Sequence, residues 1–348
     1  MANKPINHTQ QIQVKNNWIW VVLLSIIVGF IYISPDIAGI YKMGNKYQGI
    51  PSIGFGDETF YLARLNGVYK GDYRLANPGI YEHRNDPMVM SALPEIILAS
   101  PGKMFHIPLN KLDILYTFLL PATLFLLIYY FVLIIANSHR AAIACAFTVL
   151  FGMAFLSKAF LLSAKLASPL YTLPLLFSRP VNPQFHYIPF VLSLILIYCA
   201  LKCKRHGFLK ALFGSLLVGY LFYTNPFYWS FIYAGMAVLL FLAFMLKIEN
   251  IKKRYIIVIF AISVSLSIPF WLSTFQTMAS PNYKQLFHKY LMVENHNPVL
   301  PILHLFILAA YILTNRHRKE FWFILSFLIG GFLCLNQQII TGGTFRPG

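Results

Sequence analysis

Apolar runs of about 20 residues recur along this chain, which is the length that an α-helix needs to cross a bilayer. Since backbone polar groups inside a bilayer must be satisfied within the spanning segment, we expect an all-α fold, a polytopic transmembrane helical bundle. The composition agrees, with 58% hydrophobic and only 11% charged residues. We predict about nine spans, at residues 18–35, 113–136, 141–163, 187–203, 208–224, 228–246, 255–274, 298–314 and 320–338.

The spacing of the spans predicts one integral membrane domain over residues 1–348, with a large first external loop at 36–112. Residues 113–338 form the expected bundle, and residues 339–348 form an external end. Because that end stops at a Pro-Gly turn directly after a span, we expect the natural chain to continue further.

The first external loop is expected to contain two short helices. In the stretch from Asp57 to Tyr69, apolar residues recur at helical spacing. Residues 88–105 are apolar and contain Pro94, which predicts a kinked or interfacial helix.

The formal net charge of +17 suggests nucleic-acid binding, but the distribution of the charge argues against it. Basic clusters fall in alternate connections between spans, as the positive-inside rule requires of cytoplasmic loops. We therefore predict a multi-pass protein of the cell membrane, with a cytoplasmic amino terminus, membrane lipids around it and no nucleic-acid partner. The clusters are Lys202, Lys204 and Arg205; Lys247, Lys252, Lys253 and Arg254; and Arg316, Arg318 and Lys319.

Acidic residues are concentrated around the first loop: eight of the chain's eleven lie from Asp36 to Asp113, seven of them within the loop. Two of them, Asp57 and Glu58, are adjacent at the start of a predicted helix. One carboxylate could accept a proton from an attacking hydroxyl while the other holds a cation or the acceptor. The alternative is helix capping, because acids in a first turn are favoured by free N–H groups and the helix dipole.

The run from Gly56 to Tyr61, followed by Tyr-Leu-Ala-Arg and by Asn77-Pro78-Gly79-Ile80-Tyr81-Glu82-His83, resembles the first external loop of GT-C glycosyltransferases. These polytopic enzymes, such as protein O-mannosyltransferases and aminoarabinose transferases, use lipid-linked sugars. The resemblance implies an inverting transfer from a polyprenyl-phosphate sugar to an acceptor hydroxyl outside the membrane. Asp57 would then be the catalytic base, and Glu58 or Glu82 would hold a metal or the acceptor.

Further residues are candidates for substrate binding under this resemblance. Arg179 and Arg346 suit the lipid phosphate, because a guanidinium donates paired hydrogen bonds, although either arginine could simply reach lipid headgroups. Asn182 could line a cleft or belong to an interfacial turn, and Gln338 could line a cavity or bond between helices. Tyr61 and His83 complete the set, although a lone histidine is more often a surface residue.

A divalent metal ion of unknown identity, held by Asp57 and Glu82, is the one cofactor that we consider, and no organic cofactor is expected. The partners are a lipid-linked sugar donor and an unidentified glycan, lipid or protein acceptor. Two alternatives stay open: a transporter or flippase for a lipid-linked saccharide, and a non-catalytic subunit of a surface-polymer machine. An ion-coupled carrier would need charged residues at mid-span, where this sequence has almost none.

Overall fold

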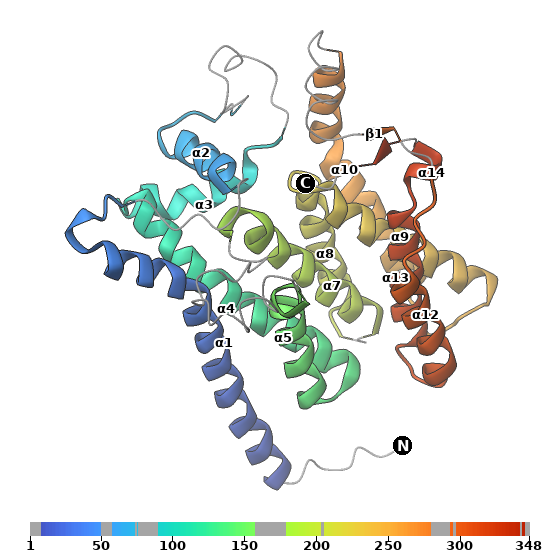
Figure 1. Ribbon diagram of the computed structural model, residues 1–348. Helices are drawn as coiled ribbons and strands as arrows, with labels where there is room; N and C mark the ends of the chain where they lie inside the picture. Colours follow the sequence, from blue (N-terminus) through green and yellow to red (C-terminus); the bar gives the residue numbers. More distant parts are fainter. Residues whose placement is uncertain are drawn as a thin grey trace. The chain divides into compact units, whose positions relative to one another are not determined.

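The computed structural model describes residues 8–49, 58–73, 75, 90–156, 179–202, 205–279, 293–294, 297–341 and 343–344 (Figure 1). Over these residues the protein is helical, apart from two antiparallel two-residue strands, β1 (Val293–Glu294) and β2 (Gly343–Thr344). The expected all-helical class is therefore confirmed for the part of the chain that can be described.

The helices follow one another in the order that the apolar runs predict. They are α1 (His8–Met43), η1 (Gly44–Lys46), α2 (Glu58–Tyr69), α3 (Leu93–Met104), α4 (Leu109–Ala136), α5 (His139–Leu156), η4 (Pro180–Phe185), α7 (His186–Lys202), α8 (Gly207–Leu221), α9 (Pro226–Met245), α10 (Lys253–Met278), α12 (Ile302–Asn315), α13 (Phe321–Leu335) and α14 (Gln338–Thr341).

Among the described residues, five helical segments are long and apolar enough to cross a membrane: Trp18–Lys46, Leu109–Ala136, Pro180–Lys202, Pro226–Met245 and Lys253–Met278. They coincide with five of the predicted spans and support the assignment as a multi-pass membrane protein. At the other predicted spans the structure has shorter apolar helices, His139–Gly152, Gly207–Leu221, Ile302–Asn315 and Phe321–Leu335. The number of about nine crossings therefore stays a prediction.

The chain divides into two compact units, of which the first comprises residues 1–72 and 95–188. In this unit α1 packs on α4, and α4 packs on α5 (Figure 1). A Cβ on Gly29 of α1 would lie 2.8 Å from the Phe118 ring of α4, so the glycine permits a close helix crossing. The Tyr32 hydroxyl donates to the Leu150 carbonyl over 2.8 Å and joins α1 to α5.

The second unit comprises residues 73–94 and 189–348, and its closest helix pairs are α9 with α13 and α8 with α10 (Figure 1). A Cβ on Gly330 of α13 would lie 2.6 Å from the Gly235 nitrogen of α9. Small residues let helix backbones approach in this way in membrane proteins, where apolar burial alone does not drive association. Whether the two units form the single domain expected from the sequence stays a prediction.

The predicted first loop differs from the structure at both ends. Helix α1 continues past Pro35 to Met43, and α4 begins at Leu109, so both ends of the 36–112 segment are helical. The helix predicted from Asp57 to Tyr69 is confirmed from Glu58 to Tyr69 as α2, and Asp57 lies outside the described residues. The helix predicted over residues 88–105 begins only at Leu93, which places Pro94 in its first turn. A proline is tolerated there because the first N–H groups need no helical partner, so Pro94 is not expected to kink the helix, and the interfacial alternative stays a prediction.

Candidate functional site

Three buried carboxyl groups lie together in the first unit. Asp36 of α1 is 7% exposed, Glu58 of α2 is 5% exposed and Asp113 of α4 is 2% exposed. Glu58 and Asp36 both act on Asp113 through Coulombic repulsion, so the three carboxyl groups are electrostatic neighbours. We call Asp36, Glu58 and Asp113 the carboxyl cluster.

Two polar atoms of this region lack a hydrogen-bond partner among the described residues. One is Asp113 Oδ1 and the other is the Tyr47 hydroxyl, and both are buried. Burial raises the pKa of Tyr47, and the negative charges of Asp36 and Asp113 raise it further. Since buried polar groups are nearly always hydrogen-bonded, these two atoms mark a place where a ligand, a proton or water would be stabilising.

Repulsion limits the charge that the carboxyl cluster can carry. Buried carboxylates that repel one another do not all ionise, and such a group titrates as a unit. The cluster therefore favours binding a group that carries hydrogen-bond donors. These are the properties that acid–base chemistry and hydroxyl recognition require.

Local structure explains how each acid reaches this place. Glu58 lies in the first turn of α2, where free N–H groups and the helix dipole favour a negative charge. Asp113 follows Leu112, which is also buried, and the Thr117 hydroxyl donates to the Asp113 carbonyl over 3.0 Å. Because α1 continues beyond Pro35, Asp36 lies on a helix rather than in a loop.

A hydrogen bond joins two of the residues predicted to bind substrate. Asn182 Nδ2 donates to the Tyr61 hydroxyl oxygen over 2.7 Å. Asn182 itself has extended backbone angles (φ −137°, ψ 119°) and interrupts the helix η4. Arg179 lies three residues earlier in sequence, half-buried at the start of η4. Asn182 therefore contacts α2, as a common site requires.

A buried ion pair fixes α2 against α3. Arg64 Nε donates to Glu95 Oε1 over 2.5 Å, and the two side chains are only 1% and 3% exposed. The Arg64 guanidinium also lies over the Phe60 ring, and its positive charge acts on the buried His186 at the start of α7. A second contact between α2 and α3 comes from Lys103 Nζ, which donates to the Val68 carbonyl over 3.0 Å.

The remaining predicted site residues have different outcomes. Gln338 belongs to the second unit, where its amide donates to the Asn297 carbonyl over 3.0 Å, and its role in substrate binding stays a prediction. Four others fall outside the described residues and stay predictions: Asp57, Glu82, His83 and Arg346.

The predicted metal ligands, Asp57 and Glu82, cannot be placed for the same reason. Among the described residues, no group of three or more His, Cys, Asp or Glu side chains has an arrangement suited to a metal ion. This also holds for the carboxyl cluster. The metal site stays a prediction about the undescribed residues.

Sequence reasoning did not single out Asp36, Arg64, Glu95 or Asp113, although all four are buried. A usable signal was present, because an ionisable residue within an apolar helix is costly and usually functional or paired. Glu95 and Asp113 fit that description in α3 and α4. No family model, curated protein or solved structure matches this chain, so its chemistry must be inferred from these residues.

Proposed function

We propose that this protein is a membrane glycosyltransferase that moves a sugar from a polyprenyl-phosphate donor to an acceptor hydroxyl on the outer face of the membrane. One observation carries the proposal: three buried acids, Asp36, Glu58 and Asp113, interact electrostatically, and Glu58 directly follows the predicted catalytic residue, Asp57, in sequence. Buried ionisable groups in a membrane protein are costly and usually mark a functional site, which supports a catalytic or binding role for these acids.

In this mechanism the acceptor hydroxyl attacks the anomeric carbon of the donor sugar. Its oxygen forms the new bond to that carbon while its proton passes to Asp57. The bond between the anomeric carbon and the phosphate oxygen breaks, and the lipid phosphate leaves with the electron pair. Attack from the face opposite the phosphate inverts the anomeric configuration.

The carboxyl cluster would position the acceptor. A sugar or protein hydroxyl is a hydrogen-bond donor, and Asp113 Oδ1 is a buried acceptor without a partner among the described residues. Glu58 adjoins Asp57 in sequence and acts electrostatically on Asp113, so it connects the proposed base with the proposed acceptor subsite. The Tyr47 hydroxyl, also buried, would donate a hydrogen bond to the acceptor oxygen.

The donor phosphate would lie near Arg179. A departing phosphate gains negative charge, and a guanidinium stabilises it with paired, charge-assisted hydrogen bonds. The contact between Asn182 and Tyr61 supports this placement, because it holds the segment that carries Arg179 against α2. A divalent cation at Asp57 and Glu82 would neutralise the same charge.

The charge distribution in the long helices supports an enzyme rather than an ion-coupled transporter. Residues 114–135 of α4, 227–245 of α9 and 255–278 of α10 contain no Asp, Glu, Lys or Arg. Coupling sites of carriers need ionisable groups at this depth.

The direct experiment is a transfer assay with purified protein and a panel of polyprenyl-phosphate sugars. We expect release of the lipid phosphate together with a glycosylated acceptor for at least one donor. Glu58→Gln should lower that rate strongly, whereas Asp72→Asn, an exposed acid after α2, should not. Donor movement across vesicles without any bond cleavage would instead support a flippase.

A further inference from the structure

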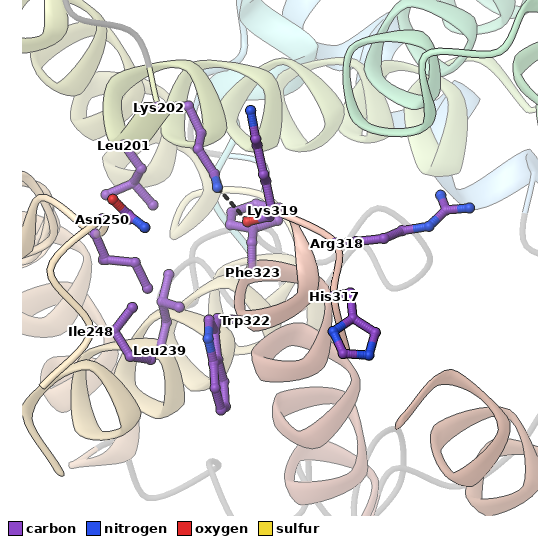
Figure 2. Close-up of a pocket in the computed structure, with 11 residues that line it drawn as sticks. Leu201, Lys202, Leu239, Ile248, Asn250, His317, Arg318, Lys319, Trp322 and Phe323 are labelled. Carbon is purple, nitrogen blue, oxygen red and sulfur yellow. Dashed lines mark hydrogen bonds between the residues drawn. The ribbon is translucent and has the colours of Figure 1, made fainter. Parts of the chain in front are cut away.

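A cavity lies at the end of the second unit where its basic connections meet, remote in sequence from the carboxyl cluster. Its volume is about 260 Å³, and it is lined by Lys202 at the end of α7, Asn250 after α9 and Lys319 before α13 (Figure 2). These are the same connections that the positive-inside rule predicts to be cytoplasmic. We call this the basic cavity.

Cations and apolar side chains occupy different parts of the basic cavity. Leu201, Leu239 and Phe323 are buried and form its apolar wall. Lys202, Arg318 and Lys319 supply positive charge, and no acidic residue is among those that line it. An anion with an apolar part attached would match both surfaces, whereas a small hydrated ion would leave the apolar wall unused.

The Lys202 ammonium group is already oriented. Its Nζ donates to the Lys319 carbonyl over 2.5 Å, as Figure 2 shows. Among the described residues this is its one hydrogen bond, and an ammonium group has three N–H donors. Two donors therefore remain for a ligand, on a side chain that a backbone contact holds in place.

Helix α13 adds to the positive potential. Its first residue is Phe321, and Trp322 and Phe323 of its first turn line the cavity. Free N–H groups and the dipole make a helix N-terminus favourable for anions. Trp322 also suits a membrane interface, where an indole places its ring in the apolar region and its N–H toward water.

One acid opposes this charge. Glu320 acts electrostatically on Lys202, and its carboxylate accepts a hydrogen bond from the Tyr198 hydroxyl over 3.4 Å. Its negative charge lowers the positive electrostatic potential at the basic cavity, although Glu320 does not line the cavity. Glu320 therefore offers a substitution with the opposite expected effect on binding. Removing its negative charge should strengthen binding of an anion.

We propose that the basic cavity binds the phosphate headgroup of an anionic membrane phospholipid, independently of the glycosyl transfer proposed above. The volume lies below the roughly 300 Å³ at which sites for drug-sized molecules begin, so it suits a headgroup and not a whole lipid. The glycerol and upper acyl carbons would contact the apolar wall, and the phosphate would accept hydrogen bonds from Lys202 and Lys319. The alternative ligand is free inorganic phosphate, which would offer the same group to Lys202 and Lys319.

Native mass spectrometry of the full chain in detergent, titrated with phosphatidylglycerol or with zwitterionic phosphatidylcholine, tests this proposal. We expect saturable binding of phosphatidylglycerol and weak binding of phosphatidylcholine. Lys202→Gln and Lys319→Gln should each weaken phosphatidylglycerol binding by roughly fivefold, the usual effect of one cation at a lipid surface. Glu320→Gln should strengthen it, and the exposed Arg205→Gln, which removes a charge outside the cavity, should leave it unchanged.

The Lys319 side chain is exposed and takes no part in the hydrogen bond, which uses the Lys319 backbone carbonyl. Lys319→Gln should therefore fold normally and can test the proposal if Lys202→Gln does not fold. An equal loss of binding in Arg205→Gln would overturn the proposal, because the effect would then reflect net charge alone. Equal affinity for phosphatidylcholine would overturn it as well. Displacement of the lipid by inorganic phosphate at matched concentration would overturn the lipid as the ligand and identify a site for soluble phosphate.

Discussion

Asn182 Nδ2 donates a hydrogen bond to the Tyr61 hydroxyl over 2.7 Å, although 121 positions separate the two residues in sequence. Both were selected from sequence for the same proposed site, one from the acidic loop and one from a Pro-rich turn. Their contact links α2, which begins at Glu58, to the segment that begins with Arg179. The link between those two segments can be tested without a substrate.

We predict that Tyr61→Phe and Asn182→Ala each lower the free energy of unfolding by about 1 kcal/mol, the usual net value of one hydrogen bond. The double variant should lose less than the sum, because both changes remove the same contact. Thermal denaturation in detergent measures all three. The exposed Tyr41→Phe is the matched control and should leave the melting temperature unchanged. If the double variant loses as much free energy of unfolding as the two single variants together, the contact contributes nothing to stability.

The pair formed by Arg64 and Glu95 should be essential for folding. Arg64→Met leaves the Glu95 carboxylate buried without its partner, and such changes cost roughly 3–5 kcal/mol. We expect poor expression and early aggregation, measured by fluorescence-detected size-exclusion chromatography. The double change Arg64→Met with Glu95→Leu should restore much of the folded fraction, because no unpaired charge is left. Normal folding of Arg64→Met alone would contradict a structural role for the pair.

The carboxyl cluster predicts opposite effects on stability and on activity. Asp113→Asn relieves repulsion with Glu58 and Asp36, so the melting temperature should stay the same or rise. Transfer should fall, because the amide donates hydrogen bonds where a carboxyl group would accept them. Activity and melting temperature are measured on the same preparation, with Asp72→Asn as control. A clear loss of stability in Asp113→Asn would mean that the acid has a structural function.

The long helices could be predicted from sequence because apolar runs of sufficient length depend only on local composition. The site could be predicted less well, and the reasons are visible in particular residues. Asp36 was assigned to the start of the first loop and Asp113 to the first residue of the second span, and neither was selected. Nothing local indicates that α1 continues past Pro35 or that α4 begins at Leu109. The pairing of Arg64 with Glu95 depends on the tertiary contact between α2 and α3, which the spacing of residues in sequence does not encode.

Arg179 should affect donor use more than catalysis at saturating donor. Arg179→Lys keeps the charge but loses the planar pair of donors, so KM for the polyprenyl-phosphate sugar should rise by roughly tenfold. Because the acceptor subsite is formed by other residues, KM for the acceptor should change little. Initial rates at varied donor and varied acceptor separate the two effects. An unchanged donor KM in Arg179→Ala would assign the residue to lipid-headgroup contact instead.

Membrane orientation can be tested by cysteine labelling in a background that lacks the four natural cysteines. Thr59 on α2 and Arg254 on α10 are both exposed, so each substituted thiol is accessible from its own side. We predict that a membrane-impermeant maleimide added to intact cells labels Thr59→Cys and does not label Arg254→Cys. Permeabilised cells provide the control, in which both should react. The reverse pattern would place the proposed site on the cytoplasmic side.

The most direct test of glycosyl transfer at this site is the transfer rate of Asp57→Asn, measured together with its melting temperature. Asparagine preserves the shape of the side chain and caps a helix about as well as aspartate, so the melting temperature should remain unchanged. If Asp57 is the general base, the rate should fall by about 100-fold or more. An unchanged rate, with at most a small loss of stability, would show that Asp57 only caps α2 and would contradict the proposed catalytic role.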